Sequence, residues 1–340
     1  MTRLLVELLD AHDEASFAAY HGLSERAERA AYQWKPSFYS LDEWRRYFGT
    51  PTADTRDELF VARVAGTGAI VGGGNLAFPL LDNLDTAWFV IAVDPAHQSC
   101  GVGTALLRFA EERALTAGRH TLHGGTEIRF GHEGEHPRIA WLAREGYAVY
   151  ASDRYSQLTL PTPAGLLASL SREAAAAHHS AYEIVTCRET LPAALVEGYC
   201  AVQNQLVADA PTGTLSFEEE RLTPAAWRER NARSRQMGRH NLFTLAVGGG
   251  EVVAHTDAFV TPDGRRAVQA GTTVAREHRG HRLGLAIKCA NLLALEADHP
   301  ECVVIDTTTN SANAPMHAVN DRLGFRPVAE AVQVAKRLVR

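Results

Sequence analysis

The sequence predicts an α/β protein made of two tandem domains that share one plan, each with a sheet flanked by helices. A glycine-containing loop recurs at matching places in the two halves, and each half closes on a short amphipathic segment that ends in glycine and an aromatic residue. The length of 340 residues is large for one hydrophobic core and sufficient for two domains of about 150 residues each. We therefore expect a duplicated domain.

The recurring loop is the strongest functional signal in the chain. Its first copy is Gln98-Ser99-Cys100-Gly101-Val102-Gly103, and its second copy is Arg279-Gly280-His281-Arg282-Leu283-Gly284. Each copy follows a run with strand character and opens an amphipathic stretch, so several backbone N–H groups point to one spot that suits a pyrophosphate. Glycine permits close approach of the backbone to phosphate oxygens. A tight turn or a helix cap without any ligand is the alternative.

We therefore expect both loops to bind phosphate groups. In the first half the expected contacts are Gln98, Ser99, Gly101, Val102, Gly103 and Thr104. In the second half they are Arg279, Gly280, His281, Arg282, Leu283 and Gly284. The Arg282 guanidinium could itself grip a phosphate, or it could be solvated.

Each half repeats the same order of elements around its loop. Runs rich in Val, Ile and aromatic residues predict strands at 59–64, 70–78, 87–93, 242–247, 251–260, 267–274 and 302–307. Apolar periodicity predicts helices at 104–117 and 285–297. Glycines at 66 and 68, and at 248–250, predict turns between the first two strands of each half.

The two halves stay in step along the chain. The loops lie 181 residues apart, and the closing segments, which end at Gly146-Tyr147 and Gly324-Phe325, lie 178 residues apart. Pro161-Thr162-Pro163 followed by small residues indicates a connector, in which 166–177 could form a helix. The expected organisation is an N-terminal domain at 1–158, a linker at 159–181 and a C-terminal domain at 182–340.

Composition argues against several classes of protein. A net charge of -6 and a pI of about 6.2 disfavour a nucleic-acid partner. The five cysteines never adopt Cys-x-x-Cys spacing, which fits reduced thiols better than disulfides or a zinc site. No run approaches the roughly 18 apolar residues of a spanning helix, and the N-terminus is too acidic for a signal peptide. We expect a cytoplasmic protein with no membrane partner.

A histidine-containing run at 132–136, with His123 upstream, is the place where a metal site could be suspected. Polar loops that contain glycine and histidine are usually only loops, and the spacing of these residues is not diagnostic of a ligand set. No metal is therefore expected.

These motifs resemble those of the GNAT acyltransferase superfamily, in a tandem two-domain arrangement like that of mycothiol synthase. Residues 272–284 carry the resemblance together with Asn310, Asn313, Met316, Asn320 and the closing Leu323-Gly324-Phe325. The resemblance implies acetyl-CoA, or another acyl-CoA, as co-substrate. It also implies a mixed, largely antiparallel sheet in each domain that splays open after its fourth strand.

In such a fold the pantetheine arm would lie in the splayed cleft. Backbone groups left unpaired by the splay must be satisfied, and the amides of pantetheine can pair with them. The expected partners are Ile91 and Val93 in the first half and Thr273 and Val274 in the second. A backbone N–H of Val93 or Val274 would then stabilise the oxyanion of acyl transfer.

The resemblance leaves the catalytic residues open. The usual acid, a tyrosine four residues before the closing glycine, is replaced by Leu142 and Asn320, and the usual glutamate base is missing from both fourth strands. Asparagine can hydrogen-bond a thiolate but does not donate a proton in the ordinary way. Asp257 is our candidate base, with a solvated aspartate as the alternative. Asn310 and Asn313 are expected against coenzyme A, although an N-cap or an Asx-turn explains them equally.

We therefore expect an N-acyltransferase that acetylates the primary amine of a small-molecule metabolite, as a monomer or a homodimer. A catalytically inactive acyl-CoA-binding or sensor protein is the alternative that the missing tyrosine and glutamate favour, and a protein acetyltransferase is another. No motif identifies the acceptor. Its pocket could be lined by Trp34, Tyr39, Trp44, Tyr199 and Trp227, although aromatic residues on helices more often belong to the core. The second half has more polar residues around its expected cleft, so we expect it to perform the chemistry.

Overall fold

The computed structural model describes residues 3–35, 38–132, 136–178, 181–209, 218 and 221–339. These residues fall into two compact units. Unit 1 contains residues 3–152, without the gaps just given, together with 218 and 331–339; unit 2 contains the described residues from 153 to 209 and from 221 to 330. The domain bounds expected from the sequence stay a prediction. The described part of the stretch expected as a linker belongs to unit 2.

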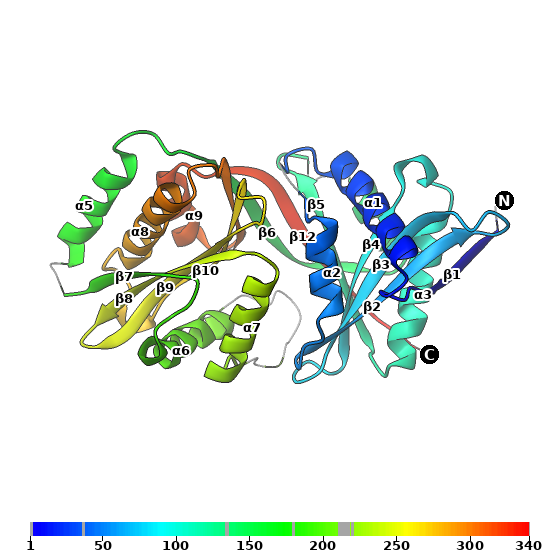
Figure 1. Ribbon diagram of the computed structural model, residues 1–340, viewed down its shortest axis with the longest axis horizontal. Helices are drawn as coiled ribbons and strands as arrows, with labels where there is room; N and C mark the ends of the chain where they lie inside the picture. Colours follow the sequence, from blue (N-terminus) through cyan, green and yellow to red (C-terminus); the bar gives the residue numbers. More distant parts are fainter. Residues whose placement is uncertain are drawn as a thin grey trace. The chain divides into compact units, whose positions relative to one another are not determined.

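Unit 1 contains a mixed, largely antiparallel sheet (Figure 1). Its elements are β1 (Leu4–Leu8), α1 (Glu14–Ala31), α2 (Leu41–Gly49), β2 (Thr55–Val64), β3 (Ile70–Pro79), β4 (Thr86–Val93), α3 (Val102–Thr116), β5 (Thr121–Arg129), α4 (Pro137–Arg144), the start of β6 (Ala148–Thr159) and the end of β12 (Arg326–Arg337). The strands β1 to β4 pair antiparallel in sequence order, β5 joins β4 in parallel, and β12 follows β5.

Helices α1 and α3 cover opposite faces of this sheet. A Cβ at Gly72 would meet Val102 and Leu106 of α3, whereas a Cβ at the next residue, Gly73, would meet the Tyr20 ring of α1. Successive side chains of a strand point to opposite faces, which fixes the two layers. The glycines let both helices approach the sheet closely.

Unit 2 has the same plan. Its elements are the end of β6, α5 (Leu166–His178), β7 (Glu183–Arg188), α6 (Ala193–Asp209), α7 (Pro224–Gln236), β8 (His240–Gly248), β9 (Glu251–Val260), β10 (Arg266–Val274), α8 (Leu283–Asp298), β11 (Val304–Asn310), α9 (Ala314–Leu323) and the start of β12. The strand order is β6-β11-β10-β9-β8-β7, with β10 and β11 parallel and the other described ladders antiparallel. The expected fold class is therefore confirmed.

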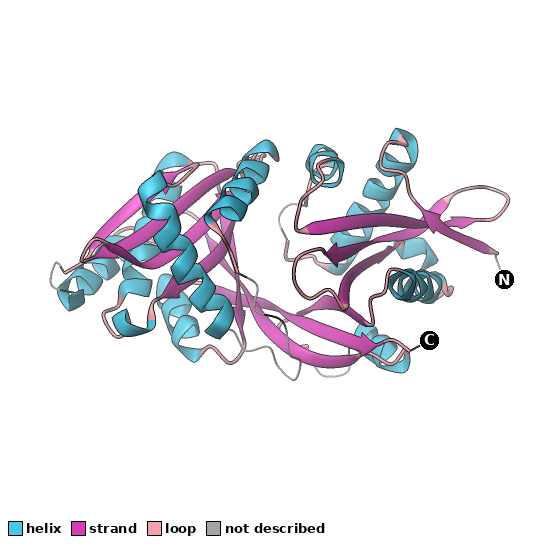
Figure 2. Cartoon of the chain, turned by 90° about the horizontal axis from the view of Figure 1, so that it is seen from below, coloured by secondary structure: helices cyan, strands magenta, loops and turns pink. Residues whose placement is uncertain are grey.

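The two faces of the unit 2 sheet have separate cores, with helices on both sides (Figure 2). Helix α8 packs on one face with α5 and α9, through a cluster that includes Leu167, Leu170, Leu292 and Phe325. The helix expected within the linker is thus α5, and it contributes to this core. Helices α6 and α7 cover the other face through Val196, Tyr199, Trp227, Phe243 and Leu245.

Each sheet opens between its two parallel central strands. The ladder of β4 with β5 runs from Thr86–Thr121 to Trp88–His123, whereas β4 remains paired with β3 as far as Val93. The ladder of β10 with β11 likewise runs from Arg266–Val304 to Gln269–Thr307, whereas β10 remains paired with β9 as far as Val274. The expected splay is present in both units. Only β10 carries a bulge there, at Ala270 between Gln269 and Gly271.

Candidate functional site

A pocket of about 810 Å³ occupies the splayed cleft of unit 2. The end of β10, the loop that opens α8, the end of β11 and the start of α9 form its walls. Of the residues predicted to bind coenzyme A, the pocket is lined by Thr273, Val274, Arg279, Gly280, Arg282, Leu283, Gly284, Asn310 and Asn313. His281 is not among the lining residues. Four segments that are separated in the sequence thus meet around one cavity.

The two phosphate-loop candidates share one backbone conformation. Each has two left-handed residues spaced two apart: Ser99 (φ 60°) and Gly101 (φ 82°) in unit 1, and Gly280 (φ 87°) and Arg282 (φ 55°) in unit 2. The glycine therefore stands at the second position in unit 1 and at the first in unit 2. The residue directly before each helix, Gly101 or Arg282, makes no side-chain cap hydrogen bond. The first turn of each helix thus keeps backbone N–H groups available for an anion.

The last glycine of each loop leaves room that the fold itself does not use. Gly103 and Gly284 are helical, and a Cβ at either position would meet only ordinary contacts, at 3.7 Å from Trp141 and 3.9 Å from Val274 respectively. Neither backbone strain nor crowding within the protein therefore demands glycine here. Glycine at these two positions would let a phosphate approach the start of the helix closely, so both loops fit the phosphates of coenzyme A.

The arginines of the second loop have protein partners. Arg282 forms an ion pair with Glu173 of α5, and Arg322 of α9 binds the other oxygen of the same carboxylate. The Nε of Arg279 donates to the carbonyl oxygen of Val274 at 3.2 Å, which ties the loop to the end of β10. Arg282 is thus held by a carboxylate, and Arg279 lies beside the pocket with its side chain exposed.

Asn310 and Asn313 organise the opposite wall. Asn310 ends β11; its Oδ1 accepts from the N–H of Ala312 at 3.0 Å and its Nδ2 donates to Asp153 at 3.2 Å. Asn313 is the N-cap of α9, and its Oδ1 accepts from the N–H of Met316 at 3.2 Å. Both asparagines therefore perform the turn and cap roles that were the alternative, and both also line the pocket.

Two buried polar side chains lie deeper under α8 and α9. Asn320 donates from Nδ2 to Thr309 at 3.2 Å, and its buried Oδ1 has no hydrogen-bond partner among the described residues. Lys288 lines the pocket, is only 1 % exposed, and lies with Nζ 5.2 Å from the centre of the Phe325 ring. Burial lowers the pKa of Lys288 to about 7. Sequence reasoning missed Lys288, although a lysine on the apolar face of a helix was a usable signal.

Asp257 lies on the α6 side of the sheet, at the level of the bulge. Its Oδ1 is 2.7 Å from Nδ1 of His255, which sequence reasoning also missed. His255 is fully buried, and its ring centre is 4.5 Å from that of Tyr199. Burial and the charge of Asp257 raise the pKa of Tyr199. The two-residue spacing of His255 and Asp257 on one strand was the sequence signal for this pair.

Gly271 separates Asp257 from the pocket. It pairs with Asp257 across the β9–β10 ladder and also lines the pocket. A Cβ on Gly271 would lie 3.6 Å from Asp257 Oδ2, 3.6 Å from Gln203 Oε1 and 3.6 Å from His255 Cε1. The pocket therefore adjoins the Asp257 cluster across a residue that has no side chain.

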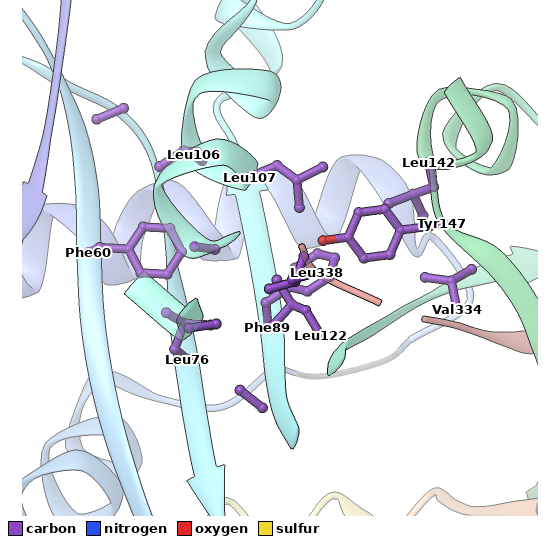
Figure 3. Close-up of a cluster of buried hydrophobic side chains, with 14 of the residues drawn as sticks. Phe60, Leu76, Phe89, Leu106, Leu107, Leu122, Leu142, Tyr147, Val334 and Leu338 are labelled. Atoms are coloured by element: carbon purple, nitrogen blue, oxygen red, sulfur yellow. The ribbon is translucent and has the colours of Figure 1, made fainter. Parts of the chain in front are cut away.

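The corresponding positions of unit 1 have a different character. The residue one before the end of β10 pairs with His255, and the residue one before the end of β4 pairs with Gly73. The residue three before the end of β10 pairs with Asp257, and the residue three before the end of β4 pairs with Asn75. On the first helix after the loop, Leu107 takes the place of Lys288. Leu107 is buried in the apolar core of unit 1 (Figure 3).

Several predicted residues of unit 1 have structural partners. Ile91 and Val93 are half-buried on β4 and pack against the core. Thr104 accepts from the indole N–H of Trp141 at 3.2 Å and donates to Glu145 at 3.2 Å, which ties α3 to α4. Gln98, Ser99, Gly101, Val102 and Gly103 form the loop and the helix start. Whether they bind coenzyme A stays a prediction.

The described residues were searched for groups that could hold a metal ion and for helices that could span a membrane. Among the described residues, no group of three or more His, Cys, Asp or Glu side chains is arranged to hold a metal ion. Part of the histidine-containing run, at 133–135, lies outside the described residues. The helices of the described ranges include none with the length and apolar character needed to cross a bilayer.

The chain was compared with protein-family models and with solved structures. Residues 18–127 match the model of the Acetyltransferase (GNAT) family. A tandem GNAT protein from the clavulanic acid biosynthesis pathway, solved without AcCoA, is similar over 98 % of both chains, with 24 % identity and a TM-score of 0.79. A GCN5-related N-acetyltransferase from Sphaerobacter thermophilus is similar over 98 % of this chain and 95 % of its own, with 14 % identity and a TM-score of 0.66.

A third similar structure is a GCN5-related glucosamine N-acetyltransferase region in a fungal multi-domain GH3 beta-N-acetylglucosaminidase. It covers 98 % of this chain and 38 % of its own, with 12 % identity and a TM-score of 0.64. A search of curated proteins found no match to the chain. At these identities the structures establish a shared tandem fold, and the family match covers residues 18–127, which lie in unit 1.

Proposed function

We propose that this chain, of which residues 18–127 match the model of the acetyltransferase (GNAT) family, transfers an acyl group from acetyl-CoA, or another acyl-CoA, to the primary amine of a small molecule. The observation that carries the proposal is the pocket of unit 2, because it combines a splayed strand pair with a helix start that suits phosphates. The acyl-CoA supplies the activated carbonyl carbon. The protein supplies binding, orientation and proton transfer.

Binding of the donor is assigned to three parts of the pocket. The backbone of Gly280 to Gly284 would hold the pyrophosphate at the start of α8. Backbone groups of Thr273 and Val274, on the β11 side of β10, would pair with the amides of pantetheine. The polar side chains of Gln269 and Thr307, both buried at the point where β10 and β11 part, would face the reacting end.

The acceptor amine would approach from the α6 side. Asp257 is the carboxylate nearest to Gly271, with Oδ2 at 3.6 Å from the position of a Cβ, and its side chain is 15 % exposed. Tyr199 and Trp227 of the α6–α7 core lie on the same side. A carboxylate at this place can attract an ammonium and hold its proton. Asn320, on the α9 side, is proposed to hydrogen-bond the departing thiolate.

Unit 2 is the better candidate for the catalytic half. Where unit 2 has His255, Asp257 and Lys288, unit 1 has glycine, asparagine and leucine at the matching positions. The pocket described above lies wholly within unit 2. Unit 1 is proposed to contribute stability, with a loop that retains the conformation for binding phosphates.

Isothermal titration with acetyl-CoA tests the donor, followed by turnover with a panel of small primary amines, read as free thiol released. The proposal expects saturable binding and thiol release that depends on the amine. No detectable binding at millimolar acetyl-CoA would overturn the enzyme assignment.

An acyl-CoA-binding or sensor protein without catalysis is the second candidate. It is favoured by Leu142 and Asn320, which stand where a tyrosine acid is expected. Saturable acetyl-CoA binding combined with no thiol release for any amine of the panel would support it. Thermal stabilisation alone does not separate the two candidates, because any ligand of the folded state raises the melting temperature.

A further inference from the structure

We infer that His255, Asp257 and Gln203 form the binding site for the primary ammonium group of the acceptor, and that His255 accepts its proton. The inference rests on the proposed function and names the groups that would act on its second substrate. It also changes the role of Asp257, from a base that acts directly to the residue that positions His255.

The geometry of the cluster points to a missing ligand. Asp257 Oδ2 and Gln203 Oε1 both lie 3.6 Å from the place where a Cβ of Gly271 would be, and so does Cε1 of His255, which is bonded to Nε2. His255 is fully buried, and its Nε2 has no hydrogen-bond partner among the described residues. Gln203 Oε1 is buried and also lacks a partner among them. Buried polar atoms without partners are costly unless something binds them.

The hydrogen-bonding character of these atoms defines the ligand. Asp257 as a carboxylate only accepts hydrogen bonds, so the contact of 2.7 Å with His255 places the imidazole hydrogen on Nδ1. The Nε2 atom is then an acceptor, as are Asp257 Oδ2 and Gln203 Oε1. Two of these acceptors border the space beside Gly271, and Nε2 is one bond away from Cε1, which borders it too. Together they match the three N–H bonds of a primary ammonium group. The charge of the Asp257 carboxylate also balances that of the ammonium.

Neutral groups surround the His255–Asp257 pair on the helix and on both flanking strands. Tyr199 of α6 also faces the pair and hydrogen-bonds Asp257; burial, together with the charge and the hydrogen bond of Asp257, raises the pKa of Tyr199, so its hydroxyl stays neutral. The residues paired with His255 on the flanking strands, Leu245 and Thr273, do not titrate. An imidazolium formed at His255 would be stabilised by the Asp257 carboxylate, which lies 2.7 Å from its Nδ1.

The reaction balances with this assignment. The ammonium gives one proton to His255 Nε2, and the free amine nitrogen attacks the carbonyl carbon of the thioester. A C–N bond forms, the C–S bond breaks, and the sulfur leaves with the bonding electron pair. The nitrogen loses a second proton, which goes to the thiolate, so the products are an amide and free coenzyme A. His255 returns its proton to solvent.

Nitrogen NMR of histidine-labelled protein tests the site without any turnover. The resonances of His255 are identified by their loss in His255→Gln. We expect the Nδ1–H tautomer, and a change at Nε2 on addition of ethylammonium but not of tetramethylammonium, which has no N–H bond. In Asp257→Asn the hydrogen should move to Nε2 and the response should disappear. An Nε2–H tautomer in the unaltered protein, or equal responses to both cations, would overturn the inference.

Kinetics with the amines of the panel provide the second test. Gln203→Leu should raise the amine KM about tenfold to a hundredfold, because one hydrogen bond to a charged group is lost. Gly271→Ala should do the same, since its methyl group makes only ordinary contacts of 3.6 Å and fills the ammonium space. Gln205→Leu is the matched control on α6, because Gln205 also has a buried Oε1 without a hydrogen-bond partner among the described residues but does not border Gly271.

The affinity for acetyl-CoA shows whether a negative result concerns the proposed function or only the ammonium site. It should be unchanged in Gln203→Leu, as measured by titration calorimetry, because Gln203 does not line the pocket assigned to acyl-CoA. If acetyl-CoA does not bind the unaltered protein, the proposed function itself is wrong. If it binds and is turned over while Gln203→Leu and Gly271→Ala leave the amine KM at the control value, only the ammonium site is wrong.

Discussion

The ring of Phe89 lies against the backbone of Gly124, where a Cβ would be only 2.4 Å from its Cζ atom. Phe89 also packs edge-on against Tyr147, with ring centres 5.5 Å apart (Figure 3). The β4–β5 ladder ends at Trp88 and His123, so this ring lies against the first residue of β5 beyond the point where the two strands part. In unit 2 the strands part after Gln269 and Thr307, and both of these residues line the pocket.

Replacing Phe89 by alanine should therefore affect stability and leave catalysis unchanged. Phe→Ala in a core costs about 3–5 kcal/mol through lost burial and the cavity left behind. Unit 1 lacks counterparts of His255 and Asp257, so opening its cleft should add no second active centre. Urea unfolding and thiol release, measured on the folded variant, check the two parts. A folded Phe89→Ala protein with lost or doubled turnover would contradict the proposed division between the units.

Matched changes in the two loops should have unequal effects on turnover. Arg279→Glu combined with Gly280→Val should lower kcat/KM for acetyl-CoA by about a hundredfold or more, because a repelling charge replaces a charge-assisted contact. Gln98→Glu combined with Gly101→Val should chiefly reduce stability. Both glycines have positive φ, at 87° and 82°, so the backbone strain is similar, at about 1–3 kcal/mol.

Thiol release and thermal unfolding of both double variants provide the measurement. Each variant serves as the control of the other for backbone strain, because both place valine at a glycine of positive φ, although the charge changes by two units at Arg279 and by one unit at Gln98. Loss of turnover in a folded Gln98→Glu, Gly101→Val protein, with the unit 2 variant still active, would reverse the assignment.

The fold was predictable because its signals are local and occur twice. Strand runs, the loop between β4 and α3, and the closing glycine each depend on a few neighbouring residues, and the repeat in the second half strengthens each of them. The bulge at Ala270 had no such signal. It arises where β10 bends away from its ladder with β11, and the sequence around it gives no sign of an extra residue.

The site was predictable only in part, for the same reason. The loop at Gly280 to Gly284 was found because glycines between a strand and a helix indicate a turn that suits phosphates. Asp257 was found because carboxylates are few near the expected cleft. Gln203 reaches the same point from α6, and only tertiary packing brings it beside Gly271. No pattern within the helix distinguishes Gln203 from Gln205. The two side chains have the same chemistry, but Gln205 does not border Gly271.

Asp306 should prove essential for the stability of unit 2. It forms an ion pair with Arg266 beneath the pocket, with the two side chains only 1 % and 9 % exposed, and Arg266 also donates to Tyr155 at 3.1 Å. Asp306→Ala leaves a buried guanidinium without its carboxylate, which costs about 3–5 kcal/mol. Combining Asp306→Leu with Arg266→Met should restore much of that loss, because neither charge is then buried. Urea unfolding measures both proteins, and a double variant no more stable than the single one would refute the explanation.

Lys288 should make the stability of the protein rise with pH from about neutrality. Burial lowers its pKa from 10.5 to about 7 in the folded protein, so between these values the unfolded chain binds the extra proton. Stability then increases with pH, by at most about 1.4 kcal/mol per pH unit for one proton. The gain is absent well below pH 7, where the lysine is charged in both states and its burial is most costly.

Urea unfolding of the unaltered protein and of Lys288→Met, between pH 6.5 and 8.5, checks this expectation. The difference between the two proteins isolates the lysine from other groups, such as Cys302, whose pKa is raised from 9.0 to about 11 and which acts in the opposite direction above pH 9. Lys288→Met should be the more stable protein at pH 6.5, and its advantage should shrink as the pH rises. A difference that stays constant over this range would mean that Lys288 keeps its charge in the folded state, held by groups other than the Phe325 ring.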